Sequence, residues 1–134
     1  MIFITHDIGV VAETCHRVIV IYAGVIAEIG DVKQVFSKPC HPYSMGLQNA
    51  FPKISDIDRE MISIPGYPPS LINPPARCLF AERCPFQEEI CWNVLPPQKQ
   101  IHPGHIAACH FAERAEELRV RARQKETWFP STRQ

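Results

Sequence analysis

The stretch RCLFAERCPFQEEICWNVLPPQKQIHPGHIAACH, residues 77–110, concentrates the chemistry of this chain. It holds four cysteines, with five, six and seventeen residues between successive members, namely Cys78, Cys84, Cys91 and Cys109. Prolines precede the stretch and interrupt its longest gap, so the sequence predicts little regular helix or sheet here. Four thiolates around one metal centre would hold such a segment together, because metal-binding energy is then also folding energy.

Composition places the chain among small globular proteins. Its 134 residues fit one small domain or part of a larger one, and 46% of them are hydrophobic. Fourteen basic residues balance fourteen acidic ones, so the net charge gives no argument for nucleic-acid binding. No apolar run approaches the roughly 20 residues that cross a bilayer, and the first residues do not resemble a signal peptide. Six cysteines in this context favour metal or redox chemistry in the cytosol over a disulfide framework.

The N-terminal third of the chain carries strand and helix patterns. Residues 2–5, IFIT, are apolar and β-branched, which predicts a buried strand that lacks neighbours in this sequence. His6 follows that strand, and Asp7 can cap a helix that begins at Ile8. His6 therefore has the position at which ligands bind in open α/β sheets.

Further elements follow in short succession. The sequence predicts a hairpin of two strands, residues 17–23 and 25–29, that turns at Gly24. Asp31 and Pro42 are each suited to the start of a helix, and residues 60–64 are predicted as an edge strand.

At Pro65 the sequence becomes extended and proline-rich, which favours a domain boundary there. We therefore predict an α+β chain in three parts: residues 1–64, a loop-rich cysteine module with a closing helix at 65–125, and a disordered tail at 126–134. The closing helix is rich in Arg and Glu and is predicted to be exposed to solvent. Its thin apolar stripe consists of Ala115, Leu118 and Ala122.

Several separate segments resemble one family, the ATPase domains of ABC transporters. They are ITHD at 4–7, VIVIYAGVIAEIGDVKQVF at 18–36, HPYSMGL at 41–47, IPGYPPSL at 64–71 and the four cysteines. Together they resemble the ATP-binding subunits of oligopeptide, dipeptide and nickel importers, which carry an extra C-terminal domain. The resemblance runs from residue 2 to about residue 111.

This resemblance implies the truncated end of an ABC ATPase α/β domain, followed by the cysteine module. The intact protein would bind ATP and Mg²⁺ and couple hydrolysis to import. Its implied partners are a second ATPase subunit and membrane permease subunits, at the cytoplasmic inner face of the cell membrane, without nucleic acid. No G-x-x-x-x-G-K-[ST] phosphate loop and no LSGGQ-type signature occur in the 134 residues. The chain is therefore expected not to hydrolyse ATP by itself.

His6 corresponds in this resemblance to the switch histidine, which contacts the γ-phosphate of ATP. An imidazole can donate one hydrogen bond to a phosphate oxygen, as a sensor of the nucleotide or as a base. Without the family context, a surface histidine after a strand is the alternative.

The residues alone leave four readings of the cysteines open: a [4Fe–4S] cluster, zinc, disulfides or free thiols. Structural zinc sites commonly bring their ligands in C-x₂₋₄-C pairs, and no such pair occurs here. The wider spacing with interleaved prolines favours a loop around a bulkier centre. The family resemblance also implies an iron–sulfur cluster, liganded by Cys78, Cys84, Cys91 and Cys109.

The remaining candidate residues are assigned structural roles. His102, His105 and His110 are read as loop residues, with His105 or His110 donating to a cluster sulfur or a carbonyl. Packing roles are predicted for Cys15, Tyr43, Phe86 and Trp92, and Cys40 is read as a free thiol in a loop. Two alternatives accompany this interpretation: a stand-alone iron–sulfur or zinc protein that senses redox state, and a homodimer formed through unpaired strand edges.

Overall fold

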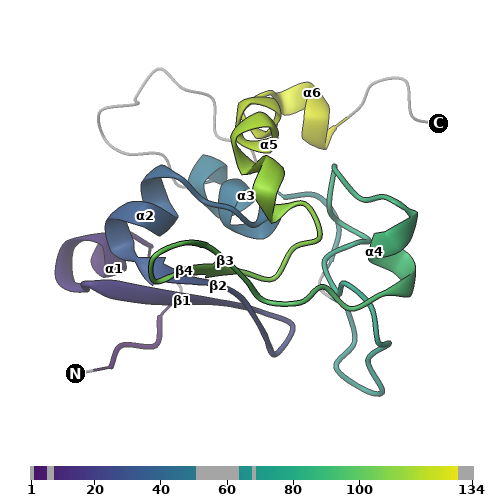
Figure 1. The fold of residues 1–134 in the computed structure, drawn as a ribbon, viewed down its shortest axis with the longest axis horizontal. Helices are drawn as coiled ribbons and strands as arrows, with labels where there is room; N and C mark the ends of the chain where they lie inside the picture. Colours follow the sequence, from purple (N-terminus) through teal and green to yellow (C-terminus); the bar gives the residue numbers. More distant parts are fainter. Residues whose placement is uncertain (1, 6–7, 51–63, 68, 130–134) are drawn as a thin grey trace.

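The computed structural model describes residues 2–5, 8–50, 64–67 and 69–129, and a four-stranded antiparallel sheet lies at its centre (Figure 1). Its strand order is β1-β2-β4-β3. The strands are β1 (Arg17–Tyr22), β2 (Val25–Asp31), β3 (Lys99–His102) and β4 (His105–Ala107). The sheet therefore joins two regions that are far apart in the sequence, and the predicted α+β class agrees with the described part of the chain.

The first hairpin forms where the sequence predicts it. Ala23 and Gly24 both have positive φ, 52° and 80°, which is the backbone of a two-residue I′-type turn. That turn matches the right-handed twist of the flanking strands, so β1 and β2 pair along their whole length, from Arg17↔Asp31 to Tyr22↔Val25.

The second hairpin corrects the expectation that the cysteine stretch holds little regular structure. β3 and β4 pair through His102↔His105, and Gly104 at φ 73° allows the chain to reverse after Pro103. β4 also pairs with β2 through Glu28↔Ala107. The prolines lie before β3 and in the turn, where the missing N–H groups disrupt no ladder, so they bound these strands rather than exclude them.

Two helices follow the first hairpin, as predicted, and a short helix precedes it. They are α1 (Ile8–Thr14), α2 (Val32–Ser37) and α3 (Pro42–Ala50). The N–H of Asp31 donates to Gln34 Oε1 at 3.1 Å, which satisfies one donor at the start of α2. α1 buries none of its residues, and Cys15 beside it is only partly buried, so the prediction of a buried Cys15 is wrong.

The C-terminal region is more structured than predicted. After the 3₁₀ turn η2 (Ala112–Arg114), α5 (Ala115–Ala122) packs against α3, and its predicted apolar stripe is buried. A second helix, α6 (Lys125–Trp128), replaces the start of the predicted disordered tail. Trp128 is 4% exposed and its Nε1 donates to the carbonyl of Ala122 at 2.9 Å, so a buried aromatic ring holds this end of the chain.

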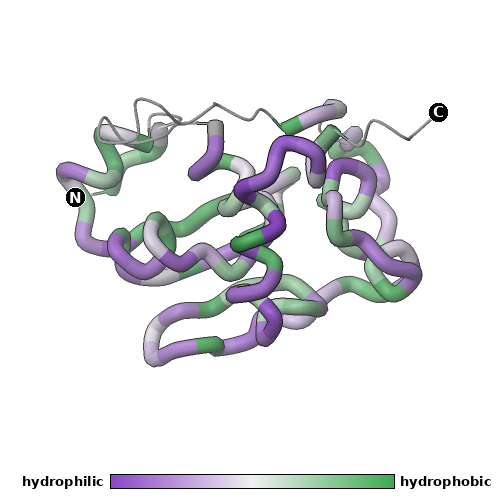
Figure 2. Tube along the Cα trace, turned by 90° about the horizontal axis from the view of Figure 1, so that it is seen from above, coloured by the Kyte–Doolittle hydropathy of each residue, from purple (hydrophilic) through white to green (hydrophobic). Residues whose placement is uncertain are grey.

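One hydrophobic core draws on both sides of the predicted boundary at residue 65. The rings of Tyr22, Tyr43 and Phe80 meet at its centre, with centroids 4.7 to 5.5 Å apart. This arrangement confirms the packing role of Tyr43. Hydrophobic stretches accordingly occur along the whole described chain rather than in one half (Figure 2). The predicted strand at 60–64 lies outside the described residues except for Ile64, which is not part of a strand.

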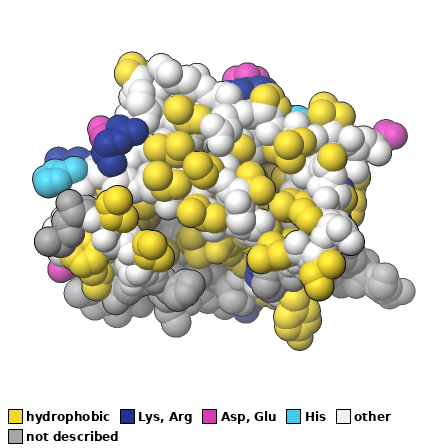
Figure 3. Space-filling view, turned by 90° about the horizontal axis from the view of Figure 1, so that it is seen from below, with side chains coloured by type: hydrophobic (Ala, Val, Ile, Leu, Met, Phe, Trp, Pro, Cys, Tyr) yellow, Lys and Arg dark blue, Asp and Glu magenta, His cyan; other side chains and the backbone are white. Residues whose placement is uncertain are grey.

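Residues 2–5 form no strand, which corrects the prediction for IFIT. No strand of the described sheet lies beside them, because β1 is an edge strand and pairs with β2 alone. Ile2 and Ile4 are almost fully exposed, and on β1 the side chains of Ile19 and Ile21 are 54% and 58% exposed. Seen from below, hydrophobic side chains spread across this face of the molecule (Figure 3).

The helices in the described part of the chain are too short and too polar to cross a membrane.

Replacing Trp128 by alanine is expected to lower the free energy of unfolding by about 3 kcal/mol, because a large buried side chain leaves a cavity. The neighbouring Phe129 is 42% exposed and serves as the matched control. Phe129→Ala is expected to change stability by less than about 1 kcal/mol. Urea unfolding followed by circular dichroism measures both variants, and equal effects would show that α6 is not anchored by Trp128.

Candidate functional site

The four cysteines of the 77–110 stretch meet around one small cavity. All four are free, and all four line this cavity. The rest of its wall is largely apolar, with Phe80, Phe86 and Phe111 among the lining residues, together with His41, Pro42, Ala81 and His110. The packing prediction for Phe86 is therefore confirmed. The cavity wall combines three segments that are distant in the sequence.

Backbone N–H groups are directed at two of the four sulfur atoms. Phe86 N lies 3.4 Å from Cys84 Sγ, and Phe111 N lies 3.4 Å from Cys109 Sγ. Hydrogen bonds to the charged form favour a thiolate over a thiol. The loop is thus folded to present its sulfurs as thiolate ligands.

Burial opposes that ionisation when no metal is bound. It raises the pKa of Cys78, raises that of Cys84 well above its usual range, and raises that of Cys109 to about 12. Proximity adds to this effect, because each of these thiols lies near other cysteines of the group and two thiolates repel each other. The apo site therefore holds thiols at neutral pH, and metal binding releases their protons.

The spacing of the sulfurs bears on the kind of centre that fits. Four thiolates on one zinc ion lie about 3.8 Å apart, from a Zn–S bond of about 2.3 Å in a tetrahedron. Among the described residues, one group of three possible ligand atoms lies within 4.8 Å of one another, and it consists of Glu28, Cys40 and His105. No three of the four sulfurs around the cavity are therefore as close together as that. Thiolates that bind different iron atoms of one cluster lie farther apart.

Two further contacts hold the cysteine loop in place. Cys78 N donates to the carbonyl of Cys91, which lies in α4 (Glu89–Asn93), at 3.1 Å. Arg83 donates to the carbonyls of Ile64 and Pro65 at 3.3 and 3.0 Å. Both ends of the segment from residue 64 to residue 91 are thereby fixed near the cavity.

Trp92 lies apart from the cavity. It is 39% exposed, its ring lies under the Arg77 guanidinium at 4.6 Å, and its Nε1 donates to Gln87 Oε1. It packs against the surface of the cysteine loop, which agrees with a packing role but not with direct contact to the centre.

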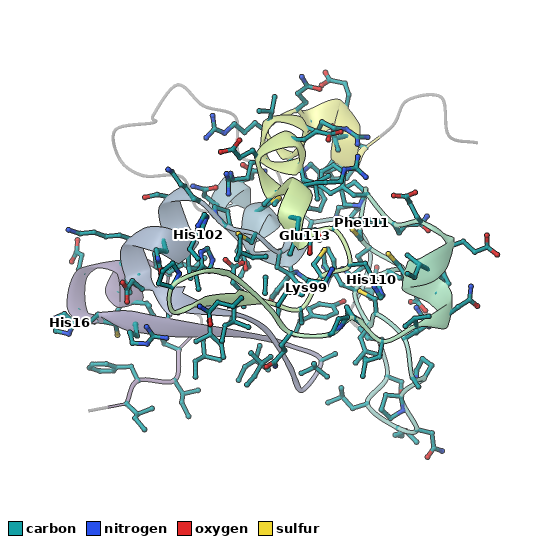
Figure 4. All side chains as sticks on the ribbon, viewed as in Figure 1. His16, Lys99, His102, His110, Phe111 and Glu113 are labelled. Carbon is teal, nitrogen blue, oxygen red and sulfur yellow. The ribbon has the colours of Figure 1, made fainter. Side chains whose placement is uncertain are left out.

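The three histidines beside Cys109 have different environments. His110 donates from Nε2 to the carbonyl of Val94 at 2.8 Å, which agrees with the predicted bond to a carbonyl. Figure 4 shows His110 and Phe111 where the chain leaves β4 for α5, and His102 at the far end of the β3–β4 hairpin, away from them. His105 is fully buried and its Nε2 pairs with Glu28.

Glu28 is the centre of a buried polar network that sequence reasoning missed. Its carboxylate, with no exposed surface, accepts the N–H groups of Cys40 and His41 at 3.0 Å and pairs with His105 Nε2. A Cβ on Gly30 would lie 3.1 Å from the His105 ring, so glycine leaves room for the imidazole. The signal in the sequence was a single charged residue in an apolar strand.

The ligand atoms of Glu28, Cys40 and His105 lie within 4.8 Å of one another, so this network also has the composition of a metal site. Its hydrogen bonds argue for a structural role. Both Glu28 oxygens are already occupied by backbone donors, and Arg119 places a positive charge beside the Cys40 thiol. Burial raises the pKa of that thiol to about 11. The prediction that Cys40 is a free thiol is confirmed, although it is buried.

His41, the first residue of HPY, is also placed at the site, and its role was not predicted from the sequence. It is 4% exposed and lines the cavity of the four cysteines. Its Nδ1 accepts the N–H of Tyr43 at 3.0 Å. Burial lowers the pKa of His41 to about 4, so the ring is neutral at physiological pH.

His6, predicted as the switch histidine, lies outside the described residues. Its role stays a prediction.

Comparison with known proteins identifies one matching family and several relatives. Residues 27–91 match the family described as "Oligopeptide/dipeptide transporter, C-terminal region". This match covers most of β2 with Glu28, all of α3 and three of the four cysteines, and ends before His105. Residues 27–91 are therefore similar to the C-terminal region of oligopeptide/dipeptide transporter proteins.

Individual relatives extend the match over 80–81% of the chain. One is the oligopeptide transport ATP-binding protein OppD of Salmonella typhimurium, 49% identical over 109 residues. Others are a probable peptide ABC transporter ATP-binding protein, y4tR, of Sinorhizobium fredii (49% over 110 residues) and the dipeptide transport ATP-binding protein DppD of Lactococcus lactis (46% over 108 residues). The chain spans about a third of the length of these relatives, 31–33%.

Glu28→Ala is expected to lower the free energy of unfolding by about 3–5 kcal/mol, because it leaves two buried N–H groups and His105 without their acceptor. Glu117→Ala removes the exposed ion pair with Arg114 and serves as the control, with little change expected. Urea unfolding at pH 7 compares the two. A Glu28 variant as stable as the Glu117 variant would contradict the assigned role of the network.

Proposed function

We propose that this chain is the C-terminal part of the ATP-binding subunit of a peptide ABC importer. In the intact protein this subunit couples ATP hydrolysis to substrate uptake. The observation that carries the proposal is the match to OppD and DppD at 46–49% identity, together with the family match at residues 27–91. His6 would contact the γ-phosphate of ATP there. ATP and Mg²⁺ would be held mainly by parts of the subunit that these 134 residues do not contain.

The proposed partners are a second ATPase subunit and the membrane permease subunits, at the cytoplasmic face of the membrane. The exposed apolar face of β1, with Ile19 and Ile21, supports a protein contact there. A homodimer through this strand edge is one form that the contact can take in the isolated chain. Sedimentation velocity tests it, since a chain that stays monomeric at every concentration would exclude the homodimer.

We further propose that Cys78, Cys84, Cys91 and Cys109 hold a [4Fe–4S] cluster. Support comes from four free thiols around one largely apolar cavity and from the N–H groups directed at two sulfurs. Among the described residues, no three of these sulfurs lie within 4.8 Å of one another. When bound, the cluster supplies a one-electron redox centre. The residues of this chain provide four ligands, exclude water with Phe80, Phe86 and Phe111, and join distant segments.

A nucleotide titration tests the first proposal. The 134-residue chain contains no phosphate loop, so it is expected to bind ATP–Mg²⁺ no more tightly than millimolar. Isothermal titration calorimetry measures this, and submicromolar binding would refute the view that the nucleotide site is built elsewhere in the subunit.

Metal analysis tests the second proposal. Protein purified without exposure to air is expected to contain iron and acid-labile sulfide in a ratio near one, with visible absorption of a cluster. Cys84→Ser is expected to lose most of both, whereas Cys40→Ser, which alters a cysteine outside the cavity, keeps them. Because loading releases thiol protons, reconstitution of the apo protein is expected to be more complete at pH 8.5 than at pH 6.5. Zinc without iron, or an unaffected Cys84 variant, would overturn the proposal.

A further inference from the structure

We infer that His41 donates a hydrogen bond from Nε2–H to a sulfur of the cysteine-bound centre and thereby raises its reduction potential. The inference rests on the proposed cluster, and it assigns His41 a positioning and tuning role in addition to packing. Four observations support it. His41 lines the cavity, its Nδ1 accepts a hydrogen bond, its backbone is held by Glu28, and the other histidines near the site already have hydrogen-bond partners.

His41 belongs to the wall of the cysteine cavity although it lies 37 residues before Cys78. His41 lies immediately before α3, in a different segment from the cysteine loop. Its ring packs against Phe80, a neighbour of Cys78, with centroids 5.9 Å apart. His41 and His110 are the two polar rings in this otherwise largely apolar wall.

The hydrogen bond at Nδ1 decides which nitrogen carries the proton. Tyr43 N donates to His41 Nδ1, so this nitrogen presents a lone pair and cannot carry a hydrogen. The proton of the neutral ring is therefore on Nε2. Among the described residues no acceptor is found for that Nε2–H, and His41 is 4% exposed. A sulfur of a bound centre would give this N–H an acceptor.

The backbone at His41 is held firmly before any centre binds. Its N–H donates to Glu28 Oε1 at 3.0 Å, and Pro42 begins α3 immediately after it. Because its backbone is fixed, His41 loses little conformational freedom when its Nε2–H meets an acceptor. A residue that tunes a metal centre without being a ligand needs this fixed position.

The other histidines near the site are already engaged. His110 uses Nε2 for the Val94 carbonyl, and His105 uses Nε2 for Glu28. Backbone N–H groups donate to the sulfurs of Cys84 and Cys109, and no hydrogen bond to the sulfur of Cys78 or Cys91 occurs among the described residues. These two sulfurs can therefore take a further donor, and His41 lines the same cavity.

The expected consequence is electrostatic. One electron added to a cluster increases the negative charge on its sulfurs, and an N–H donor stabilises the reduced form more than the oxidised form. Removal of the donor is therefore expected to shift the potential downwards. The matched variants are His41→Leu, which removes the donor, and His41→Gln, which keeps an N–H donor in a side chain of similar length. His102→Leu, on the distant hairpin, is the control.

The experiment is an anaerobic redox titration of the four loaded proteins with dithionite and mediator dyes, followed by visible absorption and electron paramagnetic resonance. At the wild-type midpoint potential, His41→Leu is expected to raise the ratio of oxidised to reduced centre about tenfold, equivalent to 59 mV for one electron. His41→Gln is expected to lie near the wild type, and His102→Leu to equal it. A His41→Leu midpoint equal to the wild type overturns the inference while leaving the cluster in place. Wild-type protein without iron and sulfide overturns the cluster proposal, and this inference with it.

A second measurement uses the wild type alone, in case His41→Leu fails to fold or load. With ¹⁵N-labelled histidine, the apo protein is expected to show the Nε2-protonated neutral tautomer for His41. Loading is expected to shift that Nε2–H signal strongly and the His102 signal little. A His41 signal with the proton on Nδ1, or one that does not respond to loading, contradicts the inference.

Discussion

The carboxylate of Glu28 is the interaction on which the rest of this structure depends. A buried charge is tolerated only when hydrogen bonds replace water, and Glu28 obtains them from Cys40 N, His41 N and His105 Nε2. These donors come from the segment before α3 and from β4. One side chain therefore joins strand β2 to the start of a helix and to a strand more than 70 residues further along the chain. Once β4 is fixed beside β2, Cys109 follows within two residues of its end.

The cysteine cavity is a consequence of that network. Its walls are built from the start of α3, from the loop between Cys78 and Cys91, and from the segment after β4. The network positions the first and the last of these, and the ring cluster of Tyr22, Tyr43 and Phe80 positions the loop between them. Hydrophobic contacts and one polar network thus bring the thiols together, and metal binding adds its free energy to an arrangement that is already folded.

Much of the fold was accessible from local pattern. The I′-type turn at Ala23–Gly24, the helices that begin at Val32 and Pro42, and the apolar stripe of α5 all follow from residue type and spacing, and the structure confirms them. The errors share a physical cause. IFIT has the composition of a strand but no neighbouring strand, and residues 99–107 form a hairpin that proline content alone did not predict, because the prolines stand where no ladder bond is needed. Trp128 orders α6 by a hydrogen bond to the Ala122 carbonyl and by placing its ring beside Gly46 of α3.

The sequence by itself determined the family resemblance, the four cysteines as a set and their wide spacing, because motifs and ligand types are properties of the linear order. Only the tertiary structure decided what surrounds them. The burial that raises the thiol pKa values and the placement of His41 in the cavity both depend on segments far apart in the chain. Glu28 shows the same limit: a single acidic residue in a strand has no partner in its local sequence, and its partners are supplied by the fold.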